Sequence, residues 1–354
     1  MQDERVTIRG RGAADNPPNR FERSHHERDP EADEFDERPA PATQFLRDAS
    51  RTIIATNESP DIPFDASINP YRGCEHGCAY CYARPTHEFL GFSAGLDFET
   101  KILVKEDAPE LLRRTLASPR WRPRTIAVSG VTDPYQPVER RLRLTRRCLE
   151  VLAEFRNPVV AVTKNRLVTR DRDLLGELAR HRAAAVFVSV TTLDAGLARA
   201  LEPRTSTPAQ RLEAIEALAG AGVSAGVLIA PVIPGLTDHE VPAIVEASAR
   251  AGGGFAGFIP LRLPLGVGPM FEDWLARHVP ERKEKVLHRI RELRGGRIND
   301  ARFGSRMQGQ GAFAAMIEQL FAASCRKAGL GRRGPELSTD AFRRPAGRQL
   351  LLFE

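Results

Sequence analysis

Five short apolar runs recur along the chain at roughly the length of one strand plus one helix. The intervals between their starts are 34, 26, 38 and 32 residues, for starts at residues 125, 159, 185, 223 and 255. β-Branched residues dominate the runs, as is typical of strands. Helical patterns fill the gaps, over residues 142–155, 171–182, 207–221 and 239–251. This alternation predicts an α/β fold with a parallel sheet covered by helices, and fits a doubly wound sheet and a barrel equally well.

Length and hydropathy describe a chain that buries a sizeable core and does not span a membrane. The sequence has 354 residues, of which 42% are hydrophobic, and no apolar run approaches the roughly 20 residues that a membrane helix needs. The first residues lack the apolar stretch of a signal peptide. We therefore expect a cytoplasmic protein with no membrane partner.

Charge divides the chain into unequal parts. Residues 1–50 hold 12 acidic and 8 basic residues, a net charge of −4. Because the whole chain carries +6, the remaining residues carry +10. Nine Lys or Arg residues and three acids lie between Arg282 and Arg306, which fits either DNA binding or a solvated helix face of mixed charge. We expect four segments: a disordered or surface-draped acidic and polar segment, an α/β domain, a basic helical extension and a flexible tail, over residues 1–48, 49–274, 275–335 and 336–354.

Three of the five cysteines, Cys74, Cys78 and Cys81, lie within eight residues. Three thiolates on one loop can bind a [4Fe–4S] cluster and leave its fourth iron open to a small chelating molecule. A zinc site that uses His76 or His87 as fourth ligand is the alternative, although no second ligand pair exists. The other two cysteines, Cys148 and Cys325, lie in helical patterns and are expected to be buried thiols.

The C-x3-C-x2-C spacing, with Tyr80 just before the last cysteine, resembles the radical S-adenosylmethionine (SAM) superfamily. The resemblance implies a cluster held by Cys74, Cys78 and Cys81, and SAM bound at the open iron. It also implies reductive cleavage of SAM to a 5′-deoxyadenosyl radical, with electrons from a flavodoxin or ferredoxin type of donor. It favours a partial (β/α)6 TIM-like barrel, with the cysteine loop after a first strand around Ile68 and a helical C-terminal extension.

Polar residues follow several predicted strands, at the edge where barrel enzymes place their sites. The resemblance implies SAM contacts at these positions: the segment after the second strand for the methionine amino group, Ser189 for the ribose, Tyr80 for adenine and Arg204 for the carboxylate. Each residue taken singly fits a helix cap or turn equally well. The candidate SAM-binding residues are Tyr80, Ser129, Thr132, Asp133, Thr163, Lys164, Ser189 and Arg204.

Three segments, residues 61–73, 81–88 and 130–137, look like an uncharacterised bacterial radical SAM family related to spore photoproduct lyase. That resemblance covers most of residues 60–320 and implies that Tyr82, directly after the third cysteine, is a candidate catalytic residue. The lyase family places a hydrogen-donating Cys just before the Thr132-Asp133 segment, where this chain has Gly130. The resemblance therefore implies the radical-generating site of that family but not its repair of a thymine lesion in DNA.

The C-terminal residues Gln349–Phe353 resemble the short peptide with which bacterial repair proteins bind the replication sliding clamp. An apolar tail that folds back on its own barrel is the alternative. We therefore expect a radical SAM enzyme that abstracts hydrogen from an unknown substrate, with DNA or a nucleic-acid component as a candidate. The second hypothesis is a DNA- or clamp-associated protein with a structural or redox-sensing cluster.

Overall fold

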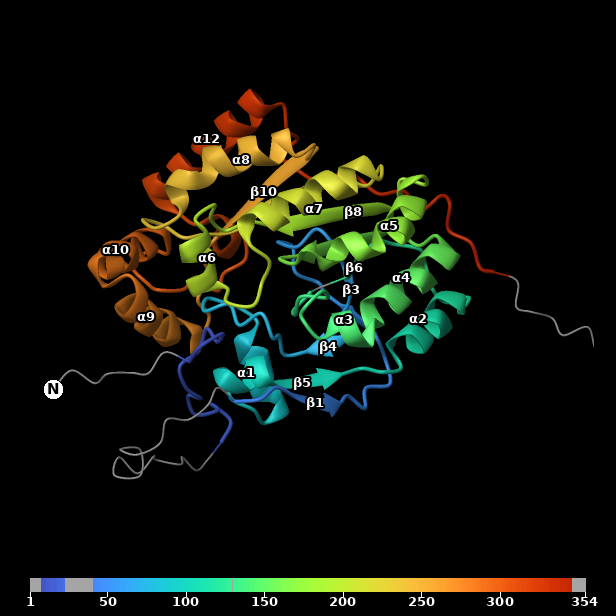
Figure 1. Ribbon diagram of the computed structural model, residues 1–354, viewed down its shortest axis with the longest axis horizontal. Helices are drawn as coiled ribbons and strands as arrows, with labels where there is room; N and C mark the ends of the chain where they lie inside the picture. The colour runs from blue at the N-terminus through green and yellow to red at the C-terminus, as the bar shows by residue number, and fades with distance from the viewer. Residues whose placement is uncertain (1–7, 23–40, 129, 346–354) are drawn as a thin grey trace, which may run out of the picture.

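The computed structural model describes residues 8–22, 41–128 and 130–345. Its main sheet contains seven strands in the order β10-β9-β8-β7-β6-β3-β2, and every pair from β3 to β10 is parallel (Figure 1). The six parallel strands are β3 (Ala66–Ile68), β6 (Ile126–Val128), β7 (Val159–Thr163), β8 (Ala184–Ser189), β9 (Ser224–Val232) and β10 (Phe255–Pro260). β2 (Ile54–Thr56) pairs antiparallel with β3 at one edge. The five apolar runs and the segment around Ile68 are thus strands, as predicted, and the partial (β/α)6 barrel is confirmed.

Helices cover the outer face of this sheet (Figure 1). Those that connect its strands are α2 (Ala108–Ala117), α3 (Glu139–Leu142), α4 (Leu144–Phe155), α5 (Arg172–Ala179), α6 (Ala195–Leu201), α7 (Pro208–Gly220) and α8 (Val241–Arg250). Helix α7 begins with a capping box, since the Thr207 hydroxyl accepts a bond from the Gln210 amide and the Gln210 side-chain oxygen accepts one from the Thr207 amide. The apolar faces of α2, α4, α5, α7 and α8 form one continuous core with the strands.

A second, smaller sheet lies beside the start of the barrel. It has the order β1-β5-β4, with β1 (Gln44–Arg47) parallel to β5 (Lys101–Val104) and β4 (Tyr71–Arg72) antiparallel to it. β4 leads directly into the three cysteines, and helix α1 (Leu96–Thr100) precedes β5. This sheet therefore fixes the start of the cysteine loop.

The N-terminal residues 8–22 pack against the cysteine loop. The Gly12 and Ala13 amides donate to the buried Glu99 carboxylate at 3.2 and 2.9 Å, and Ala13 is itself buried. The backbone is so close that a Cβ at Gly12 would lie 1.8 Å from the Gly77 carbonyl oxygen. We call residues 8–22 the strap. Its packing differs from the disordered or surface-draped segment expected over residues 1–48, because backbone amides and polar side chains such as Asn19 hold it.

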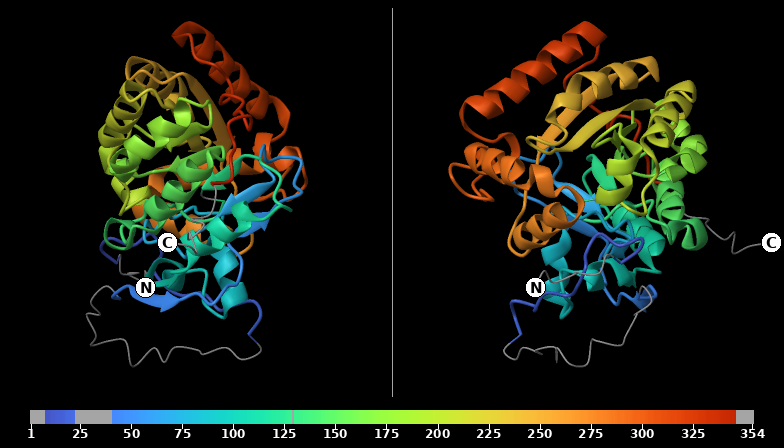
Figure 2. Two further views of the ribbon diagram at one scale, coloured as in Figure 1. Left: turned by 90° about the vertical axis from the view of Figure 1, so that its right-hand side faces the viewer. Right: turned by 60° about the vertical axis from the view of Figure 1, so that its left-hand side comes forward.

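The C-terminal part consists of four helices. They are α9 (Val267–His278), α10 (Lys283–Leu293), α11 (Ser305–Gln308) and α12 (Gly311–Ala328). Short 3₁₀ helices also occur, over Arg84–Leu90, Arg166–Asp171, Asp238–Glu240 and Pro280–Arg282. Helix α12 lies along α8 (Figure 2). The predicted helical C-terminal extension is therefore present, and it begins at Val267 rather than at 275.

Residues 331–345 run back along the barrel. Gly331 bridges to Phe255 of β10, the Phe342 ring lies 6.3 Å from that of Phe155, and the Arg343 amide donates to the Phe155 carbonyl at 2.9 Å. These contacts differ from the flexible tail expected over 336–354, for the residues described. The clamp-like peptide Gln349–Phe353 lies outside the described residues. No helix in the described part of the chain is long and apolar enough to cross a membrane.

Candidate active site

The three cysteines lie on the loop that follows β4, at the end of the barrel where the parallel strands terminate. The loop folds on itself, since the Gly77 amide donates to the Cys74 carbonyl and the Cys81 amide to the Cys78 carbonyl. Gly77 has a φ of +64° with the Glu99 carboxylate beside it, so a side chain there would be strained. Cys74 and Cys78 are buried, and Cys81 is partly buried. The loop thus withdraws two of the three thiols from solvent.

Burial raises the pKa of each of the three thiols, and nearby amides and cations partly oppose that rise. The pKa of Cys74 is raised by burial and by the charges of Asp133 and Cys81, and hydrogen bonds from the backbone amides of Asp133 and His76 oppose that rise. Burial likewise raises the pKa of Cys81, against the nearby charges of Arg84 and Lys164. Amide donors and cations at cysteine sulfur are features of iron–sulfur sites, so the residues present fit a cluster.

The described residues contain no group of three His, Cys, Asp or Glu side chains placed to hold a single metal ion. In a cubane each cysteine binds a different iron, so its ligands need not converge on one point. His87, considered above as a zinc ligand, instead directs Nε2 to the Lys101 carbonyl at 3.0 Å and packs against Phe92 and Phe98.

Asp133 joins the ends of β6 and β7 to the cysteine loop. Its carboxylate accepts hydrogen bonds from the Thr163 hydroxyl at 2.8 Å and the Lys164 amide at 2.7 Å, and lies 3.4 Å from His76 Nδ1. Burial acts to raise the pKa of Asp133, but His76 and these donors outweigh burial and lower it. The Thr132 hydroxyl donates to the Tyr71 carbonyl at 2.9 Å. Four of the predicted SAM-binding residues are therefore brought together.

Glu202 is the centre of a second buried cluster. Its carboxylate accepts hydrogen bonds from the Tyr80 hydroxyl, from Thr191 at 2.7 Å and from Arg211, and lies 3.4 Å from Lys164 Nζ. Burial acts to raise the pKa of Glu202, but Arg211 and Lys164 lower it to about 2. The ammonium of Lys164 also lies over the Tyr80 ring, 5.8 Å from its centre. Tyr80 and Lys164 are thus held in fixed positions beside the cysteines.

The remaining predicted contacts lie at the edges of these two clusters. Arg204 Nη2 pairs with Glu75 at 3.2 Å, and the Arg204 amide donates to the His76 carbonyl. Ser189 is buried at the end of β8, and its carbonyl accepts a bond from Arg211 at 3.0 Å. Ser129 lies outside the described residues.

Tyr82 differs from Tyr80 in being exposed. Its hydroxyl donates to the Gly130 carbonyl at 3.1 Å, and its ring lies 5.5 Å from the guanidinium of Arg262. A Cβ at Gly130 would lie 2.9 Å from the Ser67 hydroxyl, so the backbone is close-packed where the lyase family carries its cysteine. Cys148 is fully buried in the main core, on α4.

Several residues that organise the site were not predicted in these roles. Glu75 and His76, the second of which was considered only as a zinc ligand, stand between the first two cysteines, and Glu202 stands two residues before Arg204. Arg84 and Glu99 form a buried ion pair at 2.5 Å. Their positions next to predicted residues were the available signal, but their partners are distant in sequence and only the fold reveals them.

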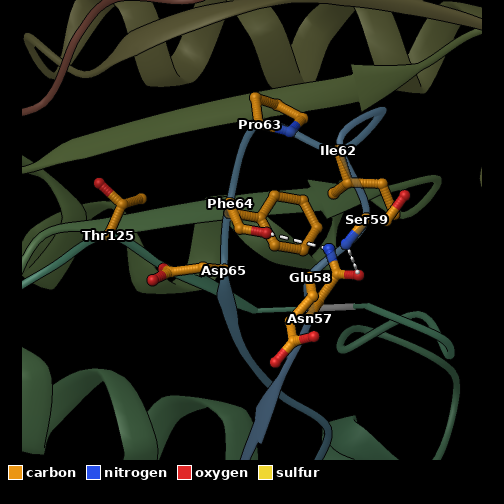
Figure 3. Close-up of a pocket in the computed structure, with 8 residues that line it drawn as sticks. All are labelled: Asn57, Glu58, Ser59, Ile62, Pro63, Phe64, Asp65 and Thr125. Atoms are coloured by element: carbon orange, nitrogen blue, oxygen red, sulfur yellow. Dashed lines mark hydrogen bonds between the residues drawn. The ribbon is translucent and has the colours of Figure 1, made fainter. Parts of the chain in front are cut away.

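A surface pocket of about 450 Å³ lies at the opposite edge of the sheet (Figure 3). Its lining includes Asp65 and Thr125, which immediately precede β3 and β6. The pocket therefore opens where β3 and β6 begin, whereas the cysteines lie where the parallel strands end, and neither the cysteines nor the candidate SAM-binding residues line it.

Comparison with known proteins assigns the family. The profile of the Radical SAM superfamily matches residues 68–247. An uncharacterised protein of Mycobacterium tuberculosis is 39% identical over 244 residues, which is 68% of this chain and 71% of that protein. An uncharacterised protein of Methanocaldococcus jannaschii is 30% identical over 173 residues, which is 49% of this chain and 62% of that protein.

Solved structures of spore photoproduct lyase share the fold. The lyase complexed with dinucleoside spore photoproduct has a TM-score of 0.59 at 16% identity, over 81% of this chain and 80% of that one. A double mutant of the lyase with bound AdoMet and the same photoproduct has a TM-score of 0.56 at 17% identity, with the same coverage. Together with the profile match and the cysteine loop, these findings show that the chain belongs to the radical SAM superfamily.

Proposed function

We propose that this radical SAM enzyme uses Cys74, Cys78 and Cys81 to hold a [4Fe–4S] cluster that takes electrons from a flavodoxin or ferredoxin type of donor. When bound, the cluster supplies the electron that splits SAM into methionine and a 5′-deoxyadenosyl radical, which abstracts hydrogen from the substrate. The observation that carries the proposal is one loop with two buried thiols and a partly buried one, with backbone amides beside Cys74 and the cations Arg84 and Lys164 beside Cys81.

The chain's own residues would bind and orient SAM. In this proposal the Thr132–Asp133 segment and Thr163 receive the methionine amino group, Ser189 the ribose and Tyr80 the adenine. Arg204 would bind the SAM carboxylate through the same guanidinium that pairs with Glu75. Lys164 is positioned by its bond to the Ala230 carbonyl at 2.7 Å and adds positive charge next to the thiols. Tyr82 is the candidate residue on the substrate side.

We propose a nucleic-acid component as the substrate to test first. Support comes from the basic region of the C-terminal part and from the shared fold with an enzyme crystallised with a dinucleoside lesion. The alternative is an iron–sulfur protein that binds DNA without cleaving SAM. No comparison supports a sliding-clamp partner.

Anaerobic SAM cleavage by the reconstituted protein tests the proposal. We expect 5′-deoxyadenosine to form with SAM and dithionite, and to form faster with damaged duplex DNA if that is the target. Cys78→Ala should abolish it, whereas Cys148→Ala, which removes a thiol buried in α4, should retain it. Equal product from both variants would contradict the cysteine assignment. DNA binding that is independent of SAM, with no cleavage, would establish the alternative.

A further inference from the structure

Arg262 is a cation without an anionic partner at the edge of the active site. It follows β10 by two residues, so it lies at the same end of the barrel as the cysteine loop. Its guanidinium lies over the ring of Tyr82, which directly follows Cys81. One nitrogen contacts the Met307 sulfur at 3.2 Å, and the buried Nε has no hydrogen-bond partner. In the described part of the chain, no carboxylate pairs with Arg262.

The neighbouring carboxylates are already occupied by other donors. Asp61 accepts bonds from Arg306 Nε and the Gly304 amide, each at 2.6 Å. Asp300 accepts bonds from Arg302 at 3.0 Å and from Ser305 at 2.7 Å. The region thus has more positive groups than acids, and desolvation followed by the charge of Arg306 lowers the pKa of Arg262.

Arg294 connects the residues around Arg262 through hydrogen bonds to backbone carbonyls. It donates to the Leu261 carbonyl at 2.6 Å and to the Arg306 carbonyl at 2.9 Å, which binds α11 to the residue that follows β10. Burial and the nearby Arg262 lower the pKa of Arg294 to about 10. Positive charges that the fold holds close together, at a cost in free energy, create a positive potential that attracts an anion.

Exposed apolar side chains accompany these arginines. Tyr82 and Phe303 are both exposed, and Phe303 lies 4.5 Å from the Arg306 guanidinium. Leu265, on the loop of Arg262, and Val131, beside the Gly130 carbonyl that Tyr82 contacts, are exposed as well. Aromatic faces together with arginine side chains form surfaces on which proteins stack flat rings and neutralise phosphate.

We propose that Arg262 binds an anionic oxygen group of the substrate, a phosphate or a carboxylate, carried by a flat ring that packs on Tyr82 and Phe303. The inference rests on the proposed function, because it takes this end of the barrel as the substrate entrance. It adds to that function a residue that selects the substrate by charge.

Calorimetric titration of the reconstituted protein with four small probes tests this site. Phenyl phosphate and benzoate carry a ring and an anion, inorganic phosphate carries the anion alone, and benzyl alcohol carries the ring alone. We expect at least one of the first two to bind more tightly than the last two. Its affinity should fall about tenfold or more in Arg262→Gln, the loss expected for a charge-assisted hydrogen bond. Whether phenyl phosphate or benzoate binds tighter distinguishes phosphate from carboxylate.

Arg289→Gln is the matched control. Arg289 also lies over an aromatic ring, that of Phe313 at 4.7 Å, but it pairs with Glu292 at 2.7 Å. Its substitution should leave probe binding unchanged. Equal losses in both variants, or no preference of the unsubstituted protein for ring-bearing anions, would overturn the inference.

Arginine modification of the unsubstituted protein provides a test that does not depend on a folded variant. Phenyl phosphate or benzoate should protect the Arg262 peptide from phenylglyoxal and leave the Arg289 peptide reactive, as read by mass spectrometry. Protection of both peptides or of neither would contradict the proposal. SAM cleavage is measured on the same preparation before modification. The absence of cleavage there would refute the proposed function, independently of the result for the anion site.

Discussion

At the residue scale, buried charges rather than apolar contacts define the surroundings of the cysteines. The sequence predicted most of the polar residues at the strand ends, because the cysteine spacing pointed to a family with a known arrangement. It did not predict that Asp133 and Glu202 would each be the centre of a hydrogen-bonded cluster. Such clusters depend on partners such as His76 and Arg211, whose proximity arises only when the barrel forms.

Glu202→Gln should strongly destabilise the fold. The substitution leaves Arg211 and Lys164 without their shared carboxylate, and removing one partner of a buried ion pair costs about 3–5 kcal/mol in the free energy of unfolding. Urea denaturation measures the change. Glu246→Gln, which breaks the exposed pair with Arg250 on α8, should cost less than about 1 kcal/mol. Similar losses in the two variants would show that the Glu202 cluster is not coupled to folding.

His87 should make stability depend on pH in mildly acidic solution. Burial lowers the pKa of His87 to about 4, below the roughly 6.5 of an unfolded histidine. The unfolded chain therefore binds the proton first, so this stability is complete above about pH 6.5 and is lost as the pH falls toward 4. Between pH 7 and 4.5 the unsubstituted protein should lose about 2–3 kcal/mol more than His87→Gln does.

Denaturation of both proteins at the two pH values gives that difference directly. The glutamine amide can still donate to the Lys101 carbonyl that His87 contacts, so the fold should tolerate the change. His288→Gln, at an exposed position on α10, serves as the control and should keep the pH dependence of the unsubstituted protein. An identical pH response of His87→Gln would mean that His87 is not the group responsible.

At the element scale, the strands with continuous apolar sequence were predictable and the other segments were not. β6 to β10 appear as apolar runs, whereas β3 has the sequence Ala-Ser-Ile and was located by resemblance to the family. The pairing of β1 with β5 spans more than fifty residues and leaves no local pattern. The strap is polar in composition, so its packing against Glu99 through backbone amides has no signature in the sequence.

Gly12→Ala should release the strap from the cysteine loop. A methyl group at this position meets the Gly77 carbonyl at 1.8 Å, and backbone cannot move aside as a side chain can. We expect the Ala13 amide, now bonded to Glu99, to lose its protection from hydrogen exchange. Gly220→Ala in α7, where no atom lies within 4 Å of the new Cβ, should keep that protection and leave the helix as stable or more so. A protected Ala13 amide in Gly12→Ala would contradict the close contact.

At the scale of the whole molecule, the barrel brings residues from distant parts of the chain to one end. The cysteine loop, the ends of β6 to β8, and the loop of Arg262 all meet where the parallel strands terminate, as expected for barrel enzymes. The family resemblance predicted the barrel, because the spacing of the strands alone fitted a doubly wound sheet equally well. The substrate end could not be predicted, because Arg262 is defined by the lack of a partner and not by a motif.

The measurement that tests the central claim most directly is electron paramagnetic resonance of the reduced, reconstituted protein with and without SAM. Three cysteine ligands leave one iron open, so SAM should bind that iron and change the signal of the reduced cluster. The account predicts a signal that shifts on addition of SAM and is lost in Cys78→Ala. A cluster signal that SAM leaves unchanged would contradict the account and identify a structural or redox cluster.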